Sequence, residues 1–250
     1  MTDFASRPRL VAMVPTYNER ENISDLIDAL LALPVEAEVH VLVADDNSPD
    51  GTGRYVEERA AGDPRVHALV RTKRRGRGAG GIDGFKAALA LGPDFIVEMD
   101  ADFSHQPKYI PDLLVAARYY DLVLGSRYVK NGRDADRRFL RRLISFFVRT
   151  FIRRLYRLKI KDVSSGFRLY RREVLEAVDL DDLVSVGQSV VLEILRKVDL
   201  LGFRIGEVPI VFIDRTRGRT KLDFLALLET LLQAVKFRKR YTRETVKAAR

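Results

Sequence analysis

Two aspartates separated by a single residue, Asp100 and Asp102, are the clearest candidates for chemistry in this chain. They follow an apolar run, 95–99, that reads as a buried strand. Residues i and i+2 of an extended chain point to the same side, so both carboxylates can face one cation. Hard cations such as Mg²⁺ prefer carboxylate oxygens together with substrate phosphates. The pair therefore indicates a divalent-metal site, although Asp134-Ala135-Asp136 repeats the spacing at a place where helix capping explains it better.

Three histidines are scattered along the chain. His105 follows the aspartate pair, and we expect it either to support the carboxylates or to add a ligand. His40 and His67 lie in or beside predicted strands, where a structural role is commoner. The sequence has no Ser/His/Asp elbow, no His-x-x-x-His spacing and no cysteine. It therefore excludes a disulfide framework, a thiolate metal site and a cysteine nucleophile.

The elements that must position these residues alternate in type along the first half of the chain. Short apolar runs ended by turn residues predict strands, and helical periodicity fills the intervals. The predicted strands are 10–14, 39–44, 66–70, 95–99 and 121–125, and the predicted helices are 22–33, 52–61, 82–91 and 111–119. This order favours an α/β fold, a Rossmann-like mostly parallel sheet with helices on both faces. Ligands collect at the carboxyl ends of such strands, where the polar clusters 15–19, 45–51 and 100–105 fall.

Basic residues gather at further loop ends on the same side of the predicted fold. Arg127 follows the fifth strand, and Arg215 to Lys221 follow another apolar run, 208–213. Arginine forks and a lysine suit the oxygens of a diphosphate. Near a carboxylate pair, these clusters indicate a phosphate-bearing ligand.

The formal net charge of +9 is concentrated in two segments. Residues 133–161 hold eleven basic and two acidic side chains, and residues 236–250 hold seven and one. Such segments indicate an anionic partner: phosphate groups, an anionic membrane or nucleic acid. No platform for stacking bases is evident in these segments, so we expect no nucleic acid partner. A basic amphipathic helix at 138–158 fits a membrane surface, and an ordinary core-packed helix with solvated arginines is the alternative.

Neither a signal peptide nor a run of about 18 apolar residues is evident. We expect residues 1–225 to form one catalytic domain that includes the basic helix, followed by a basic helix and tail at 226–250 with no transmembrane segment. The expected location is cytoplasmic, peripheral on the cytosolic face of a membrane.

Gly76, Gly78 and Gly81 fit the dinucleotide-binding pattern G-x-G-x-x-G, which makes an NAD-dependent oxidoreductase the competing hypothesis. The glycines follow the third strand rather than the first, and residues 71–75 separate them from it. A mobile glycine- and arginine-rich loop over a bound phosphate is the preferred interpretation.

Several motifs together resemble family 2 glycosyltransferases of the GT-A fold, and among them the dolichol-phosphate (polyprenol-phosphate) mannose synthases. The motifs that carry the resemblance are VPTYNE at 14–19, ADDNSPDGT at 44–52, MDADFSH at 99–105, GSRY at 125–128, SGFRLY at 165–170 and GEVPI at 206–210, with Asp214-Arg215 and Thr220-Lys221. They occur in the family's order from about residue 9 to residue 225.

The resemblance implies a GDP-mannose donor, a polyprenyl-phosphate acceptor and Mg²⁺ or Mn²⁺. By similarity, the nucleoside-binding residues are Pro15, Tyr17, Glu19 and Asp46, and the metal ligands are Asp100 and Asp102. The residues expected to hold the donor and acceptor phosphates are Arg127, Arg141, Arg215 and Lys221. Glu193 corresponds to a carboxylate on a helix that crosses the family's site.

Some features differ from the family pattern. Ser104 stands where some members have a glutamine ligand, and Arg75-Gly76-Arg77-Gly78 replaces Leu-Gly-Leu-Gly. A basic helix replaces the transmembrane helices of many members, as in members that rely on a small membrane-anchored partner. The resemblance also leaves UDP-glucose open as the alternative donor.

Overall fold

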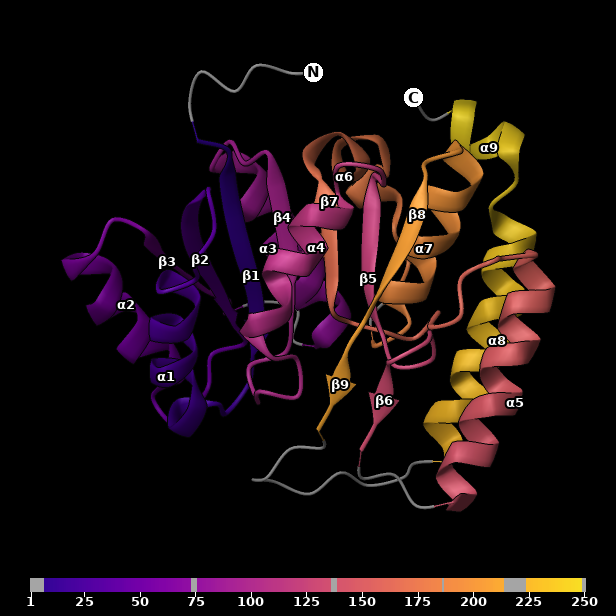
Figure 1. Ribbon diagram of the computed structural model, residues 1–250, viewed down its shortest axis with the longest axis horizontal. Coiled ribbons are helices and arrows are strands. Elements are labelled where there is room, and N and C mark those ends of the chain that lie inside the picture. The colour runs from indigo at the N-terminus through magenta and orange to yellow at the C-terminus, as the bar shows by residue number, and fades with distance from the viewer. Residues whose placement is uncertain (1–6, 73–75, 136–138, 186, 214–223, 249–250) are drawn as a thin grey trace.

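The computed structural model describes residues 7–72, 76–135, 139–185, 187–213 and 224–248 (Figure 1). Its strands are β1 (Arg9–Thr16), β2 (Glu38–Asp45), β3 (Val66–Val70), β4 (Phe95–Glu98), β5 (Leu122–Ser126), β6 (Arg133–Asp134), β7 (Arg168–Arg171), β8 (Ile205–Pro209) and β9 (Val211–Phe212). Its helices are α1 (Arg20–Leu31), α2 (Thr52–Gly62), α3 (Arg77–Ala90), α4 (Ile110–Ala116), α5 (Phe139–Tyr156), α6 (Arg172–Ala177), α7 (Val190–Leu201), α8 (Phe224–Arg240) and α9 (Arg243–Ala248), with the 3-10 turns η1 (Pro107–Tyr109) and η2 (Leu180–Asp182).

The central sheet has seven strands in the order β3-β2-β1-β4-β7-β5-β8. All neighbouring strands pair in parallel except β7, which runs antiparallel to both β4 and β5. A second, two-stranded parallel sheet joins β6 to β9 and lies below the main sheet in Figure 1. The predicted α/β class with a mostly parallel sheet is confirmed.

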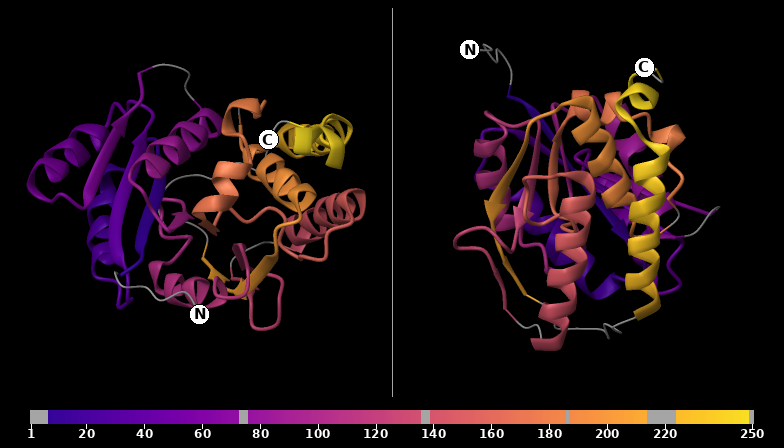
Figure 2. Two further views of the ribbon diagram at one scale, coloured as in Figure 1. Left: turned by 90° about the horizontal axis from the view of Figure 1, so that it is seen from above. Right: turned by 90° about the vertical axis from the view of Figure 1, so that its right-hand side faces the viewer.

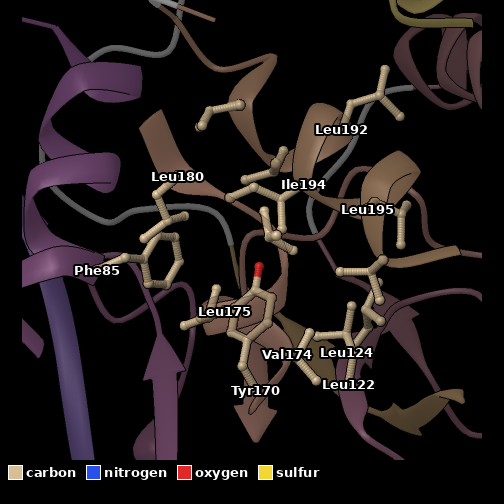
Figure 3. Packing of buried hydrophobic residues seen from close by; sticks show 14 of the residues in the cluster. Phe85, Leu122, Leu124, Tyr170, Val174, Leu175, Leu180, Leu192, Ile194 and Leu195 are labelled. Carbon is tan, nitrogen blue, oxygen red and sulfur yellow. The ribbon is translucent and has the colours of Figure 1, made fainter. Parts of the chain in front are cut away.

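Helices cover both faces of the sheet because the inner strands are apolar on both sides (Figure 2). On β1, Val11 and Met13 join one hydrophobic cluster, and Leu10 and Ala12 join the other. The first cluster lies under α3, α5, α6, α7, α8 and α9, and the second lies under α1, α2 and α4. Figure 3 shows part of the first cluster, where Phe85 of α3 meets the Tyr170 ring edge-on at 5.3 Å. The sheet is therefore a rigid support for the loops at its edge.

Several elements of the second half were not predicted, among them β7, α7 and α6. β7 escaped notice because Arg168 and Arg171 flank only two apolar residues. Arg168 is nevertheless buried, since its guanidinium donates to the carbonyls of Ser165 (2.6 Å), Val163 (3.1 Å) and Val191. α7 is buried around nearly its whole circumference, so it lacks the alternation that marks a surface helix. α6 is a single short segment that follows β7 directly.

The predicted strand at 208–213 is wrong in its extent. β8 ends at Pro209, and the chain then leaves the main sheet to form β9 beside β6. Ile210 lies at this change of sheet, where its N–H donates to the carbonyl of Ser126 at 3.0 Å. The apolar run that predicts one strand is therefore divided between β8 and β9.

α5 and α8 stand side by side at the edge of the domain beyond β8 (Figures 1 and 2). α8 and the segment after it supply Ala234, Phe237, Tyr241 and Val246 to the first hydrophobic cluster. The boundary at residue 225 stays a prediction. None of the helices in the described ranges is long and apolar enough to cross a membrane.

Candidate functional site

A pocket of about 180 Å³ opens at the carboxyl ends of β1, β2 and β4. Its lining consists of Pro15, Thr16, Tyr17, Glu19, Ala44, Asp46, Gly80, Asp100, Ala101 and Asp102. Every residue expected to hold the nucleoside or the metal therefore lies in this one pocket. The loops that bring them together come from three separate motifs, because parallel strands end at the same edge of the sheet.

Asp46 is held by groups from two other parts of the chain. One carboxylate oxygen accepts a hydrogen bond from the N–H of Gly76 at 2.8 Å, and the other accepts from the guanidinium of Arg71. Arg71 also binds Asp83 at 2.9 Å, and its side chain is almost fully buried. A Cβ at Gly80 would lie 3.2 Å from the Arg71 guanidinium, so this glycine leaves room for it. The carboxylate of Asp46 thus has a defined orientation in the pocket.

Arg71 was missed as a site residue. It directly follows β3, whose last residue, Val70, pairs with Asp45, so its backbone lies beside the end of β2. The N–H of Arg71 donates to the carbonyl of Asp45 at 2.8 Å. The adjacency of the two strand ends was the available signal, but an arginine at the start of a basic loop gives no local sign of burial.

The glycine-rich segment is not the expected loop. α3 begins at Arg77, so Gly78 and Gly81 belong to its first turns. Gly84 packs the helix onto β1, because a Cβ there would come within 2.8 Å of the Met13 sulfur. The residues 73–75 lie outside the described part of the chain. Residues 76–81 are therefore a turn and the start of a helix that supports Asp46, and not the loop that we expected.

Asp100 and Asp102 both line the pocket, but for a reason other than the one expected. β4 ends at Glu98, and residues 101–105 form a succession of bends rather than extended chain. One oxygen of Asp102 accepts from the hydroxyl of Ser104 at 2.6 Å and from its N–H at 3.1 Å. The N–H of Asp100 donates to Nδ1 of His105 at 3.0 Å. Side-chain hydrogen bonds therefore shape this loop.

The donor set of this loop fits a hard divalent cation. Two carboxylates reach the same pocket, and oxygen ligands are those that Mg²⁺ and Mn²⁺ prefer. Within the described ranges, no group of three or more acidic or histidine side chains gathers closely enough to enclose a metal. A cation held here would need further oxygens from a bound phosphate, which is the usual arrangement for Mg²⁺.

Arg127 follows β5, which ends at the same edge of the sheet as β4 but is separated from it by β7, and the residue is only 7% exposed. Its Nε and Nη2 atoms donate to the two oxygens of Asp162, each at 2.8 Å, and Nη2 also reaches Ser164 at 2.9 Å. Burial opposes both charges, but the Asp162 carboxylate raises the pKa of Arg127, and the guanidinium lowers the pKa of Asp162. The ring of Phe212 lies 5.3 Å from the Arg127 guanidinium.

Of the other basic residues expected to bind the phosphates, the structure describes one. Arg141 lies in the first turn of α5. Arg215 and Lys221 lie outside the described residues.

Glu193 is fully buried on α7 and does not line the pocket. Its carboxylate accepts hydrogen bonds from the N–H groups of Val184 (3.0 Å) and Ser185 (2.9 Å) and from the hydroxyl of Tyr241 (2.6 Å). Burial, followed by the Glu193 carboxylate, raises the pKa of Tyr241. These contacts make Glu193 a structural link between the loop before α7 and the end of α8.

Comparison with known sequences decides the family. The model of "Glycosyl transferase family 2" matches residues 11–179. An undecaprenyl-phosphate mannosyltransferase of Micrococcus luteus is 42% identical, covering 86% of this chain and 88% of the relative. A polyprenol monophosphomannose synthase of Mycolicibacterium smegmatis is 39% identical, covering 92% and 86% respectively.

The chain belongs to glycosyl transferase family 2. A third relative, a dolichol-phosphate mannosyltransferase of Pyrococcus furiosus, is 36% identical over 89% of this family 2 chain, which spans 62% of that relative's length. The predicted membership and the resemblance to polyprenyl-phosphate mannose synthases are confirmed, and so is the prediction of a glycosyltransferase. The oxidoreductase hypothesis does not fit this family.

Solved structures of lower sequence identity agree with the fold. Glucosyl-3-phosphoglycerate synthase of Mycobacterium tuberculosis, crystallised with Mn²⁺ and UDP-glucose, aligns with a TM-score of 0.65 at 19% identity, covering 92% of this chain and 80% of that one. At this identity the likeness concerns the fold alone. The predicted GT-A architecture is confirmed.

Proposed function

We propose that this family 2 transferase moves mannose from GDP-mannose to a polyprenyl phosphate, with a divalent metal and with inversion at the sugar. The observation that carries the proposal is the pocket, which gathers Pro15, Tyr17, Glu19, Asp46 and the aspartate pair at one sheet edge. The names of the relatives at 36–42% identity support the sugar and the lipid class.

The pocket provides separate places for the two ends of the donor. Tyr17 is 53% exposed at the rim, where its ring can pack on the nucleoside together with Pro15. Asp46 offers a fixed carboxylate to the N–H groups of a guanine. Asp100 and Asp102 would hold Mg²⁺ or Mn²⁺ on the diphosphate. When bound, the metal would neutralise the negative charge that develops on the leaving GDP.

The acceptor needs little activation because a phosphate monoester is already anionic at neutral pH. The absence of a catalytic histidine motif in the sequence is therefore no obstacle. One phosphate oxygen would bond to C1 of mannose while the bond from C1 to the diphosphate oxygen breaks, so one displacement inverts C1. The task of the protein is alignment and charge stabilisation. We propose that the donor and acceptor phosphates are bound by Arg127, Arg141, Arg215 and Lys221.

The outer face of α5 supports binding at a membrane surface. Leu143, Phe147 and Phe151 lie along one stripe and are 42–62% exposed, whereas Ile152 and Tyr156 are buried against the core. Between α5 and α8 lies a groove of about 520 Å³ lined by Phe147, Phe151 and Leu155 together with Arg154, Arg157 and Arg238. Exposed aromatic side chains beside arginines are typical of helices that lie in a lipid interface. We propose a peripheral location on a cytosolic membrane face, where a membrane-anchored partner would add to the attachment.

Calorimetric titration with GDP-mannose and Mn²⁺ tests the donor assignment, with UDP-glucose and NAD as parallel ligands. We expect saturable binding of GDP-mannose that requires the metal, and loss of both binding and transfer in Asp102→Ala with an unchanged fold. Binding of UDP-glucose instead would show that the transferred sugar is glucose, and the proposed mechanism would stay the same. Full mannosyl transfer by Asp102→Ala would contradict the metal assignment.

A further inference from the structure

The proposed function gives no role to His105, although this residue is deeply enclosed next to the aspartate pair. It is 4% exposed. Its imidazole stacks on the ring of Phe167 with centroids 5.2 Å apart and 12° between the planes, and it meets the edge of Phe212 at 5.7 Å. Two aromatic rings therefore fix the plane of the imidazole.

The Nδ1 atom of this ring is engaged with the backbone. It accepts the N–H of Asp100 at 3.0 Å, so it carries no proton, and the proton of the neutral ring is on Nε2. Nδ1 also lies 3.6 Å from a carboxylate oxygen of Asp100. Since its lone pair points at a backbone hydrogen, Nδ1 is not a metal ligand in this arrangement.

This hydrogen bond closes the bend that carries both aspartates. The last sheet-like bond here runs from the N–H of Met99 to the carbonyl of Met13 at 3.3 Å. Beyond it, Phe103 adopts a left-handed backbone with φ of +59°, which is costly for a residue with a bulky side chain. The loop therefore depends on the hydrogen bonds that His105 and Ser104 provide, because the sheet no longer holds it.

We propose that His105 is a positioning residue for the metal site. Its ring is fixed, and it accepts a hydrogen bond from the N–H of Asp100. This bond sets the direction of the backbone where the chain turns. The carboxylates of Asp100 and Asp102 are thereby directed toward one metal ion. The inference rests on the proposed metal role of these two aspartates. Groups that orient metal ligands in this way typically contribute 10–100-fold to metal affinity.

Two substitutions separate the hydrogen bond from the ring packing. His105→Phe keeps a ring between Phe167 and Phe212 but removes the acceptor. His105→Asn loses the ring but places an amide oxygen where Nδ1 stands. His40→Phe is the matched control, since His40 is also buried, stacks on His67 and contacts it through Nδ1 at 2.9 Å, and does not line the pocket.

The measurement is Mn²⁺ affinity by electron paramagnetic resonance titration in the presence of GDP, alongside thermal unfolding of each variant. We expect His105→Phe to weaken Mn²⁺ binding about 10-fold or more while it remains folded. His105→Asn should recover most of that affinity despite a lower melting temperature. His40→Phe should bind Mn²⁺ as the unmodified protein does. This rescue would not occur if His105 acted only through packing.

Three other outcomes would overturn the inference. Mn²⁺ affinity of folded His105→Phe within two-fold of the unmodified protein would show that the acceptor is dispensable. A loss in His105→Asn as large as that in His105→Phe would assign the effect to packing. Failure of the unmodified protein to bind Mn²⁺ with GDP would instead overturn the proposed metal role itself, and the inference with it.

Discussion

Arg127 and Asp162 form a buried bidentate ion pair that connects the end of β5 to the loop before β7. The backbone N–H of Arg127 also donates to Asp162 at 3.1 Å, and Glu207 in turn holds the backbone of Asp162 at 2.8 Å. Asp162, itself held by Glu207, thereby fixes the orientation of the Arg127 guanidinium. Two of its nitrogens, Nε and Nη2, face Asp162.

Asp162→Asn should destabilise the protein by about 3 kcal/mol or more at pH 7, because it leaves the Arg127 charge buried without its partner. The pKa of Asp162 is lowered in the folded protein, so its contribution is fully present above the ordinary value of 3.8. That contribution is lost as the pH falls through the lower folded value. Urea unfolding at pH 7 and pH 3 should show the gap between the two proteins narrowing in acid.

Asp28→Asn is the control for this comparison, because Asp28 forms an exposed ion pair with Arg59 at 2.7 Å. We expect a change within about 0.5 kcal/mol at either pH. An equal loss in both variants would mean that the burial of the Arg127–Asp162 pair has no special effect.

Arg71→Lys should weaken GDP binding about 10-fold, although it preserves the charge. A lysine cannot span Asp46 and Asp83 with a planar fork, so the Asp46 carboxylate would lose its orientation. Arg65→Lys, at an exposed pair with Asp63, should leave the affinity unchanged. Calorimetry with GDP measures both, and equal affinities would refute a nucleotide-positioning role for Arg71.

Tyr241→Phe should lower the free energy of unfolding by about 1.5–3 kcal/mol, because the buried Glu193 carboxylate loses one of its donors. Tyr119→Phe should change it by less than about 0.5 kcal/mol, since Tyr119 is 68% exposed. Chemical denaturation gives both values. A similar, small effect of the two substitutions would show that the Tyr241 hydroxyl contributes little.

Phe147→Glu should reduce binding to anionic vesicles roughly 10-fold, because burial of an aromatic side chain in lipid contributes about 2 kcal/mol and the new charge opposes it. Sedimentation with phosphatidylglycerol vesicles measures the change. Tyr119→Glu introduces the same charge at a similarly exposed aromatic residue on another face and should bind as the unmodified protein does. Unchanged binding by Phe147→Glu would place the membrane contact elsewhere than on α5.

The first half of the fold was predictable because its signals are local. β1, β2 and β3 are continuous apolar runs that end in turn residues, and the predicted bounds differ from the observed ones by at most two residues. β7 and α7 gave no such signal, because arginines flank only two apolar residues in the first and burial on all sides removes the period of the second.

The same distinction applies to the site. Motifs that directly follow strands could be assigned to the pocket edge, since topology alone brings them together. The partners that orient them could not, because Arg71 lies 25 residues from Asp46, and Asp162 lies 35 residues from Arg127. The sequence also could not show whether the apolar stripe of α5 is buried or exposed, because this depends on which side of α5 packs against α8. That contact is also distant in sequence.

The bond between Tyr241 and Glu193 has a consequence for the biosynthesis of the protein. The two residues are 48 positions apart, and Phe237 and Val246 complete the same cluster around α7. A chain still attached to the ribosome with these residues inside the exit tunnel leaves one side of α7 uncovered and Glu193 short of a donor. We therefore expect the nascent chain to stay incompletely folded, with apolar surface accessible to chaperones, until α8 and α9 have emerged.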